Sequence, residues 1–231
     1  MTDPAAPDET ASGDAPRADD GAVSDADGST ATPHGHLRRT ALAPLVERYG
    51  ELTVEPADEP YRRFVVSIVN QQLSSASAAA VRGRLFAALD DEVTPARVLA
   101  ADESTLRDAG LSAAKVDYVR NAARAFEDGL LEPARFARVD DEAVLEAVTA
   151  VRGVGAWTGK MYLLFGLGRE DVFPVEDLGI RGGMADLFDV DRGDRAAMVD
   201  RADPWRPYRS YASLYLWHHY EDGETDVGGT D

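Results

Sequence analysis

The sequence contains no cysteine, and only two of its 231 residues are lysine. Without cysteine the chain can form no disulfide, no zinc–thiolate site and no iron–sulfur cluster. No apolar run approaches the roughly 18–20 residues that a membrane-spanning helix needs. The first residues have neither the basic start nor the apolar core of a signal peptide. These absences predict a soluble, cytoplasmic protein that has no membrane partner.

Positive charge is also scarce: 24 basic residues face 42 acidic ones, which gives a net charge of −18. Thirteen of the acids lie near the two ends, so residues 36–220 keep a net charge of −6. Composition alone therefore favours a protein without a nucleic-acid partner, because such partners usually bind a basic surface. An acidic, lysine-poor chain is also what we expect in a prokaryotic cytoplasm at high salt. At 1 M salt the repulsion between like charges is screened beyond a distance of about 3 Å.

The two ends differ in composition from the rest of the chain. Residues 1–35 contain no Phe, Trp or Tyr, and residues 221–231 are acidic and rich in glycine. Neither stretch can bury enough apolar surface to offset the entropy lost on ordering. We therefore predict a disordered acidic arm at 1–35, which includes His34, a folded domain at 36–220 and a disordered tail at 221–231.

Between the ends, apolar residues recur at helical spacing, and we find no strand pattern. Ser74, Ser112 and Asp140 are suited to cap helices that follow them. The main helices are expected at residues 61–70, 75–89, 113–128, 141–150, 156–165, 178–188 and 208–220. We expect Gly182-Gly183 to break the sixth of these. The sequence predicts an all-α fold with two helical lobes and a central cleft.

Residues 151–155, Val-Arg-Gly-Val-Gly, form the turn between two of these helices. Glycine permits a positive φ and lets another backbone approach closely. The N–H groups at the start of the second helix attract an anion through their unpaired hydrogens and the helix dipole. The turn is either an ordinary tight connection or a site that holds a phosphodiester without basic side chains.

A longer set of motifs is more specific than the turn. V-x-G-V-G-x-W-T at 151–158 is followed by F-P-V-x-D at 173–177, and N-Q-Q-L-S ends at residue 74. G-L-S-x-x-K-x-x-Y at 110–118 and W-R-P-Y-R-S-Y-A at 205–212 complete the set. Taken in their order along the chain, over about residues 40–220, the motifs resemble the helix-hairpin-helix (HhH-GPD) DNA glycosylase superfamily, and within it the 3-methyladenine DNA glycosylase II type.

The resemblance implies that Asp177 is the catalytic carboxylate, placed at a helix N-terminus where the dipole favours its charge. An ionised carboxylate can stabilise the cation that forms on the sugar when an N-glycosidic bond breaks. The target nucleotide must first leave the duplex. The family position that fills the gap falls on Gln72, with Gln71 beside it and Leu73 as an alternative.

Superfamily members that also cut the strand carry a lysine where this chain has Trp157, so the resemblance implies a monofunctional enzyme. An aromatic face attracts a cationic alkylated purine. The candidate residues for the base pocket are Trp157, Tyr162, Trp205 and Tyr208. The alternative for each is a place in the core, which we expect for Trp217.

We expect Gly153, Gly155, Thr158 and Lys160 to contact DNA phosphate. The family hairpin often holds Na⁺ or K⁺ through main-chain carbonyls, which here fall on Thr149, Val151 and Val154. Arg152 stands where many members have proline. No other cofactor is expected to be required.

The leading hypothesis is a monomeric DNA-3-methyladenine glycosylase II-like hydrolase that acts on damaged double-stranded DNA in base excision repair. One alternative is a glycosylase for uracil, mismatched thymine or 8-oxoguanine. An alternative of another class is a non-catalytic helix-hairpin-helix DNA-binding module, against which Asp177 argues.

Overall fold

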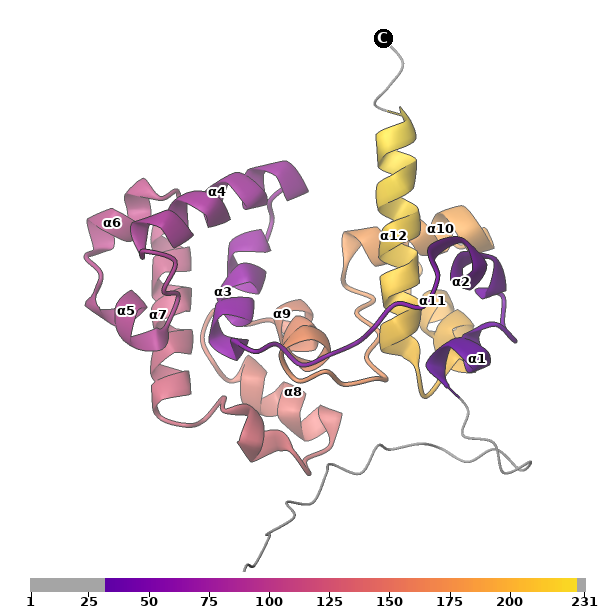
Figure 1. Cartoon of the computed structure of the whole chain (residues 1–231), viewed down its shortest axis with the longest axis horizontal. Helices are drawn as coiled ribbons and strands as arrows, with labels where there is room; N and C mark the ends of the chain where they lie inside the picture. Colours follow the sequence, from indigo (N-terminus) through magenta and orange to yellow (C-terminus); the bar gives the residue numbers. More distant parts are fainter. Residues whose placement is uncertain (1–31, 228–231) are drawn as a thin grey trace, which may run out of the picture. The chain divides into compact units, whose positions relative to one another are not determined.

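The computed structural model describes residues 32–227, which form helices and the turns that connect them, with no strand in that range (Figure 1). The helical elements are α1 Pro33–Leu37, α2 Ala43–Tyr49, α3 Pro60–Asn70, α4 Ser75–Ala88, α5 Pro95–Ala100, α6 Glu103–Asp108, α7 Ala113–Glu127, η1 Pro133–Phe136, α8 Asp141–Thr149, α9 Ala156–Met161, η2 Tyr162–Gly166, α10 Leu178–Phe188, α11 Arg195–Ala202, η3 Asp203–Trp205 and α12 Arg209–Val227. The predicted all-α fold is confirmed for the described residues.

Local sequence signals set the starts of several helices. The side chains of Ser74, Ser112 and Asp140 each accept a hydrogen bond from a main-chain N–H in the first turn of α4, α7 and α8. Each cap supplies a partner for an N–H group that the helix itself leaves unpaired. These three predicted N-caps are therefore confirmed.

The fold extends beyond the predicted limits of 36 and 220 at both ends. His34 is buried in α1, where its ring meets Tyr211 edge-on, so it does not belong to a disordered arm. At the other end α12 continues to Val227, and Asp222 accepts hydrogen bonds from Arg48 and Tyr49. These tertiary contacts hold polar segments that composition alone marks as disordered. The rest of the predicted arm, 1–31, and residues 228–231 lie outside the described residues.

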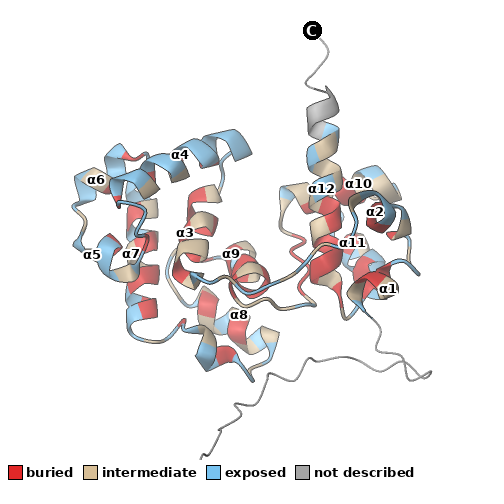
Figure 2. Ribbon diagram, viewed as in Figure 1, coloured by how far each residue is buried: buried red, intermediate tan, exposed pale blue. Residues whose placement is uncertain are grey.

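The buried apolar residues divide into two clusters, in agreement with two helical lobes. The first contains residues from Tyr61 to Val172 and involves α3, α7 and η2. The second combines Leu37 to Val46 with Phe173 to Leu216 and involves α2, α10 and α12. Buried positions run along α3, α7 and α12 in Figure 2. Trp217 packs against both clusters. The predicted central cleft stays a prediction.

Glycines allow α10 and α12 to pack closely. A Cβ at Gly182 would lie 2.2 Å from the Tyr220 ring, and one at Gly183 would lie 2.7 Å from the carbonyl oxygen of Leu216. The expectation that these glycines break the helix is wrong, because α10 runs through them without interruption. Their role is to bring α12 against α10. No helix in the described part of the chain is long and apolar enough to cross a membrane.

Candidate active site

A tight turn (residues 150–155, the hairpin turn) joins α8 to α9. Gly153 has φ 97°, in the left-handed region that favours glycine. A Cβ on Gly153 would lie 2.1 Å from Cδ1 of Tyr118, so packing also requires glycine there. Gly155 is exposed and begins α9 as an N-cap without a capping side chain. The first N–H groups of α9 therefore receive no partner from a cap and can meet an anion.

Asp177 is the N-cap of α10 and is hydrogen-bonded through both carboxylate oxygens. Oδ1 accepts from the main-chain N–H of Ile180 at 3.0 Å and from Nε1 of Trp217 at 2.8 Å. Oδ2 accepts from Nε1 of Trp157 at 2.8 Å. The main-chain N–H of Asp177 donates to the carbonyl of Pro174 at 2.9 Å, which closes the preceding turn. Three donors thus fix the orientation of one charged acceptor.

Trp217 is a residue that sequence reasoning assigned to the core and the structure places at the carboxylate. Its ring stacks on Phe165, with centroids 5.6 Å apart and planes inclined by 26°. A Cβ on Gly179 would lie 2.9 Å from Cδ1 of Trp217 and 3.2 Å from Oδ1 of Asp177. Glycine at 179 therefore makes room for the indole to reach the carboxylate. No local pattern signals this contact, because its partners are 40 positions apart.

The residue before Asp177 forms an ion pair with α9. Nζ of Lys160 lies 3.0 Å and 2.9 Å from the two carboxylate oxygens of Glu176, and the side chains are only 20% and 24% exposed. The pair ties the loop that carries Asp177 to the helix that carries Trp157. Lys160 was expected to contact phosphate, but its ammonium group is already engaged by Glu176. The phosphate contact of Lys160 stays a prediction.

Three residues were predicted to fill the gap that the target nucleotide leaves in the duplex. They lie in the loop between α3 and α4 (residues 71–74, the wedge loop) and fall into two groups. Gln72 is exposed with φ 58°, and Leu73 is 39% exposed, so both are accessible at the tip. Gln71 instead turns inward, and its Nε2 donates to the carbonyl of Gly153 at 3.1 Å and to Oγ1 of Thr158 at 2.9 Å. Thr158 is 1% exposed, so its hydroxyl faces Gln71 and not a phosphate.

Three of the four aromatic residues predicted for the base pocket lie in the core. Tyr162 is 1% exposed and packs edge-on against Phe64 and Phe126. Trp205 and Tyr208 are 1% and 3% exposed and belong to the second cluster. Their large apolar surface is used to stabilise the fold, so none offers an open face to a base. The aromatic residues at the carboxylate are Trp157 and Trp217.

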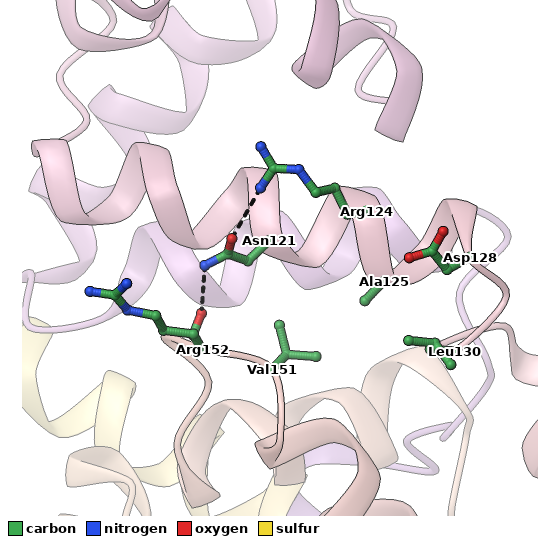
Figure 3. A pocket seen from close by; sticks show the side chains of 7 residues that line it. All are labelled: Asn121, Arg124, Ala125, Asp128, Leu130, Val151 and Arg152. Carbon is green, nitrogen blue, oxygen red and sulfur yellow. Dashed lines mark hydrogen bonds between the residues drawn. The ribbon is translucent and has the colours of Figure 1, made fainter.

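A surface hollow borders the hairpin turn on its α7 side (Figure 3). Nδ2 of Asn121 donates to the carbonyl of Arg152 at 3.3 Å, and Oδ1 of Asn121 accepts from Nη1 of Arg124 at 3.1 Å. Asn121 thereby joins the main chain of the turn at Arg152 to the guanidinium of Arg124. Both arginine side chains are exposed, and neither forms an ion pair within residues 32–223. Sequence reasoning missed Arg124, which comes from a distant helix.

The chemistry of the donors at the hairpin turn fits a monovalent cation. The predicted ligands are the carbonyls of Thr149, the last residue of α8, and of Val151 and Val154. The carbonyl oxygen of Val151 accepts a hydrogen bond from the N–H of Val154 at 3.0 Å. The second lone pair of this oxygen stays available to a cation. Neutral carbonyl oxygens are donors that K⁺ accepts in proteins. The described residues contain no cluster of three or more His, Cys, Asp or Glu that could hold a metal.

Comparison with known proteins places this geometry in a family context. Residues 65–207 match the model of the HhH-GPD superfamily base excision DNA repair protein. The chain is 32% identical over 181 residues to DNA-3-methyladenine glycosylase 1 of Schizosaccharomyces pombe, covering 76% of this chain and 79% of that protein.

Two solved structures are similar along most of their length. A 3-methyladenine DNA glycosylase of S. pombe in complex with abasic DNA has a TM-score of 0.73 and 29% identity, over 80% of this chain and 94% of the other. A DNA-3-methyladenine glycosidase of Bacillus halodurans has a TM-score of 0.68 and 31% identity, over 83% and 91%.

Proposed function

This chain belongs to the HhH-GPD superfamily of base excision DNA repair proteins, and we propose that it is a monofunctional DNA N-glycosylase. Its substrate is an alkylated purine of the 3-methyladenine kind in double-stranded DNA, and its product is an abasic site. The observation that carries the proposal is the carboxylate of Asp177 held between the indole N–H groups of Trp157 and Trp217. Relatives named for 3-methyladenine support the substrate class.

Asp177 supplies the chemistry. When the N-glycosidic bond breaks, positive charge develops on the sugar, and a fixed carboxylate stabilises that charge without reorganising. The alkylated purine leaves as a neutral base with the electron pair of the broken bond, and water then adds to the sugar carbon and releases a proton to solvent, which yields the abasic site. The donors on both oxygens keep the carboxylate oriented before substrate arrives. Since Asp177 also caps α10, its main chain is held by the helix that it starts.

Within residues 32–227 no unpaired lysine lies beside Asp177, which supports hydrolysis without strand cleavage. Strand cleavage by this superfamily requires a lysine that attacks the sugar to form a Schiff base. Trp157 occupies that position here. The nearby Lys160 is paired with Glu176 and is directed to that carboxylate.

The indole pair also supports a cationic, alkylated base as the substrate. A positively charged purine is attracted to the face of an aromatic ring, and tryptophan is the best such ring. Alkylation also weakens the glycosidic bond, so oriented charge stabilisation at the sugar is sufficient. Uracil and 8-oxoguanine are neutral and gain less from such a pocket.

In this proposal DNA is bound by main-chain groups and by a few arginines. Such binding needs few basic side chains, in keeping with a net charge of −18. The open N–H groups of α9 after Gly155 take one phosphate. Gln72 and Leu73 fill the gap that the flipped nucleotide leaves. Arg152 and Arg124 extend the contact along the strand. A Na⁺ or K⁺ at the hairpin carbonyls would add a positive charge at the phosphate.

The test is base release by the full chain from methylated, uracil-containing and 8-oxoguanine duplexes, with Asp177→Asn assayed in parallel. We expect release from methylated DNA alone, and none from the variant. Release from uracil or 8-oxoguanine duplexes instead would favour the glycosylase alternative. Binding to abasic DNA without any base release would favour a DNA-binding module, and a β-elimination product would contradict the monofunctional assignment.

The acidic composition supports a further part of the proposal, that the enzyme acts inside a prokaryotic cell at high salt. Screening at molar salt suppresses repulsion between the acidic surface and DNA. Base release measured across a potassium chloride series should then rise toward molar salt. A monotonic fall of release with salt would contradict this assignment.

A further inference from the structure

The side chain of Gln71 joins two elements that are far apart in the sequence. Its amide nitrogen donates to the carbonyl of Gly153 and to the hydroxyl of Thr158, across 82 and 87 positions. Gln71 follows the last residue of α3, and the wedge loop continues from it. The two acceptors lie in the hairpin turn and in the first turn of α9. One planar amide thus connects the wedge loop to the hairpin.

The main chain of the wedge loop is fixed from a second direction. Nζ of Lys115, in the first turn of α7, donates to the carbonyls of Val69 and Gln71 at 2.8 Å each. The carbonyl of Val69 lies in the last turn of α3 and that of Gln71 at its C-cap, where carbonyls lack partners within the helix and a cation is favourable. Burial lowers the pKa of Lys115, in keeping with its inward position. Gln71 is therefore held by both its backbone and its side chain.

The next residue contrasts with Gln71. Gln72 is exposed, and its φ of 58° is uncommon for a residue other than glycine. Its side chain has no hydrogen-bond partner within the described residues, whereas that of Gln71 has two. A rigid residue is thus followed directly by the tip of the loop. The position of Gln72 depends on where Gln71 is fixed.

The other end of the connection is equally rigid. Gly153 is packed against the Tyr118 ring, and Thr158 is buried. The hairpin therefore offers Gln71 a fixed pair of acceptors. Because Trp157 precedes Thr158 and donates to Asp177, the same short segment links the wedge loop, the hairpin and the carboxylate.

We propose that Gln71 is a positioning residue that couples the wedge loop to the phosphate-binding hairpin. It holds Gln72, the residue that fills the gap in the duplex (the plug), at a fixed distance from the bound phosphate. Insertion of Gln72 between the stacked bases therefore coincides with extrusion of the target nucleotide into the site. Gln71 itself does not enter the DNA. This inference rests on the proposed function, which supplies the roles of Gln72 and the hairpin.

The test uses substitutions that keep shape and remove one partner. Gln71→Met keeps the length of the side chain and loses the donor, Thr158→Val loses the acceptor, and Thr158→Ser keeps it. Single-turnover base release is measured on two duplexes, with one 7-methylguanine opposite cytosine or opposite a one-nucleotide gap. The gap removes the base pair that must be broken. Thermal unfolding of each variant checks that the fold is retained.

We expect Gln71→Met and Thr158→Val to slow release from the paired substrate by roughly 10- to 100-fold, the size of a loss from misplacement of about 1 Å. Release opposite the gap should change by less than about threefold, a factor worth under 1 kcal/mol. Thr158→Ser should match the wild type. Gln72→Met is the matched control, because it makes the same change at the plug itself.

Equal slowing on both substrates would overturn the inference, since the amide would then support the site in general and not the insertion step. Full activity of Gln71→Met would overturn it as well. If the wild type released no base, the proposed function would fail. Insertion of Gln72 would then be measured directly, by the fluorescence of a 2-aminopurine placed beside an abasic site. A signal that Gln71→Met leaves unchanged would then overturn the coupling itself.

Discussion

The side chains of Asp177 and Trp217 are joined by a hydrogen bond of 2.8 Å between Oδ1 and Nε1, although 40 positions separate them. The bond exists because α12 packs on α10 at Gly179 and Gly182, where a side chain would collide with the Trp217 or Tyr220 ring. The orientation of the carboxylate that we propose to be catalytic is thus a property of helix packing. Four predictions follow from this site and its surroundings.

Replacement of Trp217 by phenylalanine should slow base release and leave DNA binding intact. The change keeps a ring to stack on Phe165 and removes the N–H that reaches Asp177. A hydrogen bond to a charged group contributes about 1.5–3 kcal/mol, which corresponds to roughly a 10- to 100-fold lower rate. Single-turnover base release measures the effect. A variant that lost abasic-DNA affinity but not its rate would contradict the assigned role.

The two hairpin glycines should respond differently to alanine. Gly153→Ala places a Cβ 2.1 Å from Tyr118 at φ 97°, so overpacking and backbone strain together should cost about 2–4 kcal/mol of stability. Gly155→Ala meets no atom within 4 Å and should fold normally. Thermal unfolding would show a drop of roughly 2–4 °C per kcal/mol for the first variant. Comparable melting temperatures for both would contradict this distinction.

Lys160 and Arg152 should differ in how their loss changes the salt dependence of DNA binding. Log affinity falls with log salt, and each phosphate contact adds about 0.9 to the steepness of that fall. Arg152→Gln should therefore reduce the steepness by about 0.9. Lys160→Gln should leave it unchanged, because Lys160 is paired with Glu176, and should slow base release instead.

The control for the salt series is Arg195→Gln, at an exposed arginine of α11 without an ion pair in the described residues. Its slope should equal that of the wild type. If Lys160→Gln reduced the steepness as much as Arg152→Gln, the original expectation of a phosphate contact at Lys160 would stand. The charge exchange Lys160→Glu with Glu176→Lys should recover part of the lost rate.

Asp177→Asn should abolish base release and also reduce stability. The amide N–H₂ group opposes either Nε1 of Trp157, at the Oδ2 position, or both the Ile180 N–H and Nε1 of Trp217, at the Oδ1 position. An unsatisfied buried donor costs about 1–3 kcal/mol. Denaturant unfolding measures the loss, and adding Trp157→Phe should restore part of it. Wild-type stability of the single variant would contradict this account.

The sequence predicted the fold well where the signals are local. Ser74, Ser112 and Asp140 marked helix starts because capping depends on neighbouring residues. Asp177 was predicted to be the residue before a helix, and it caps α10. The end of α12 at Val227 was missed, since Asp222 is held by residues of α2 that no local pattern connects to it.

The site could be predicted only in part, because its partners are tertiary. Trp217 was assigned to the core and Trp205 to the pocket, and the structure has the reverse arrangement. Both are tryptophans near the C-terminus, and only the packing of α12 decides which one meets Asp177. Gln71 and Gln72 are chemically identical, so the sequence could not tell which points inward. Their backbone angles and the position of Thr158 make that difference.

The shared oxygen of Asp177 has a consequence for how such an enzyme can change. Oδ1 closes the first turn of α10 as well as receiving Trp217, so a substitution that removes the carboxylate of Asp177 also removes the cap of α10 unless the new side chain replaces it. Asp177→Ser is therefore the substitution to choose for an inactive variant that still folds and binds damaged DNA, because serine caps a helix about as well as aspartate and carries no carboxylate.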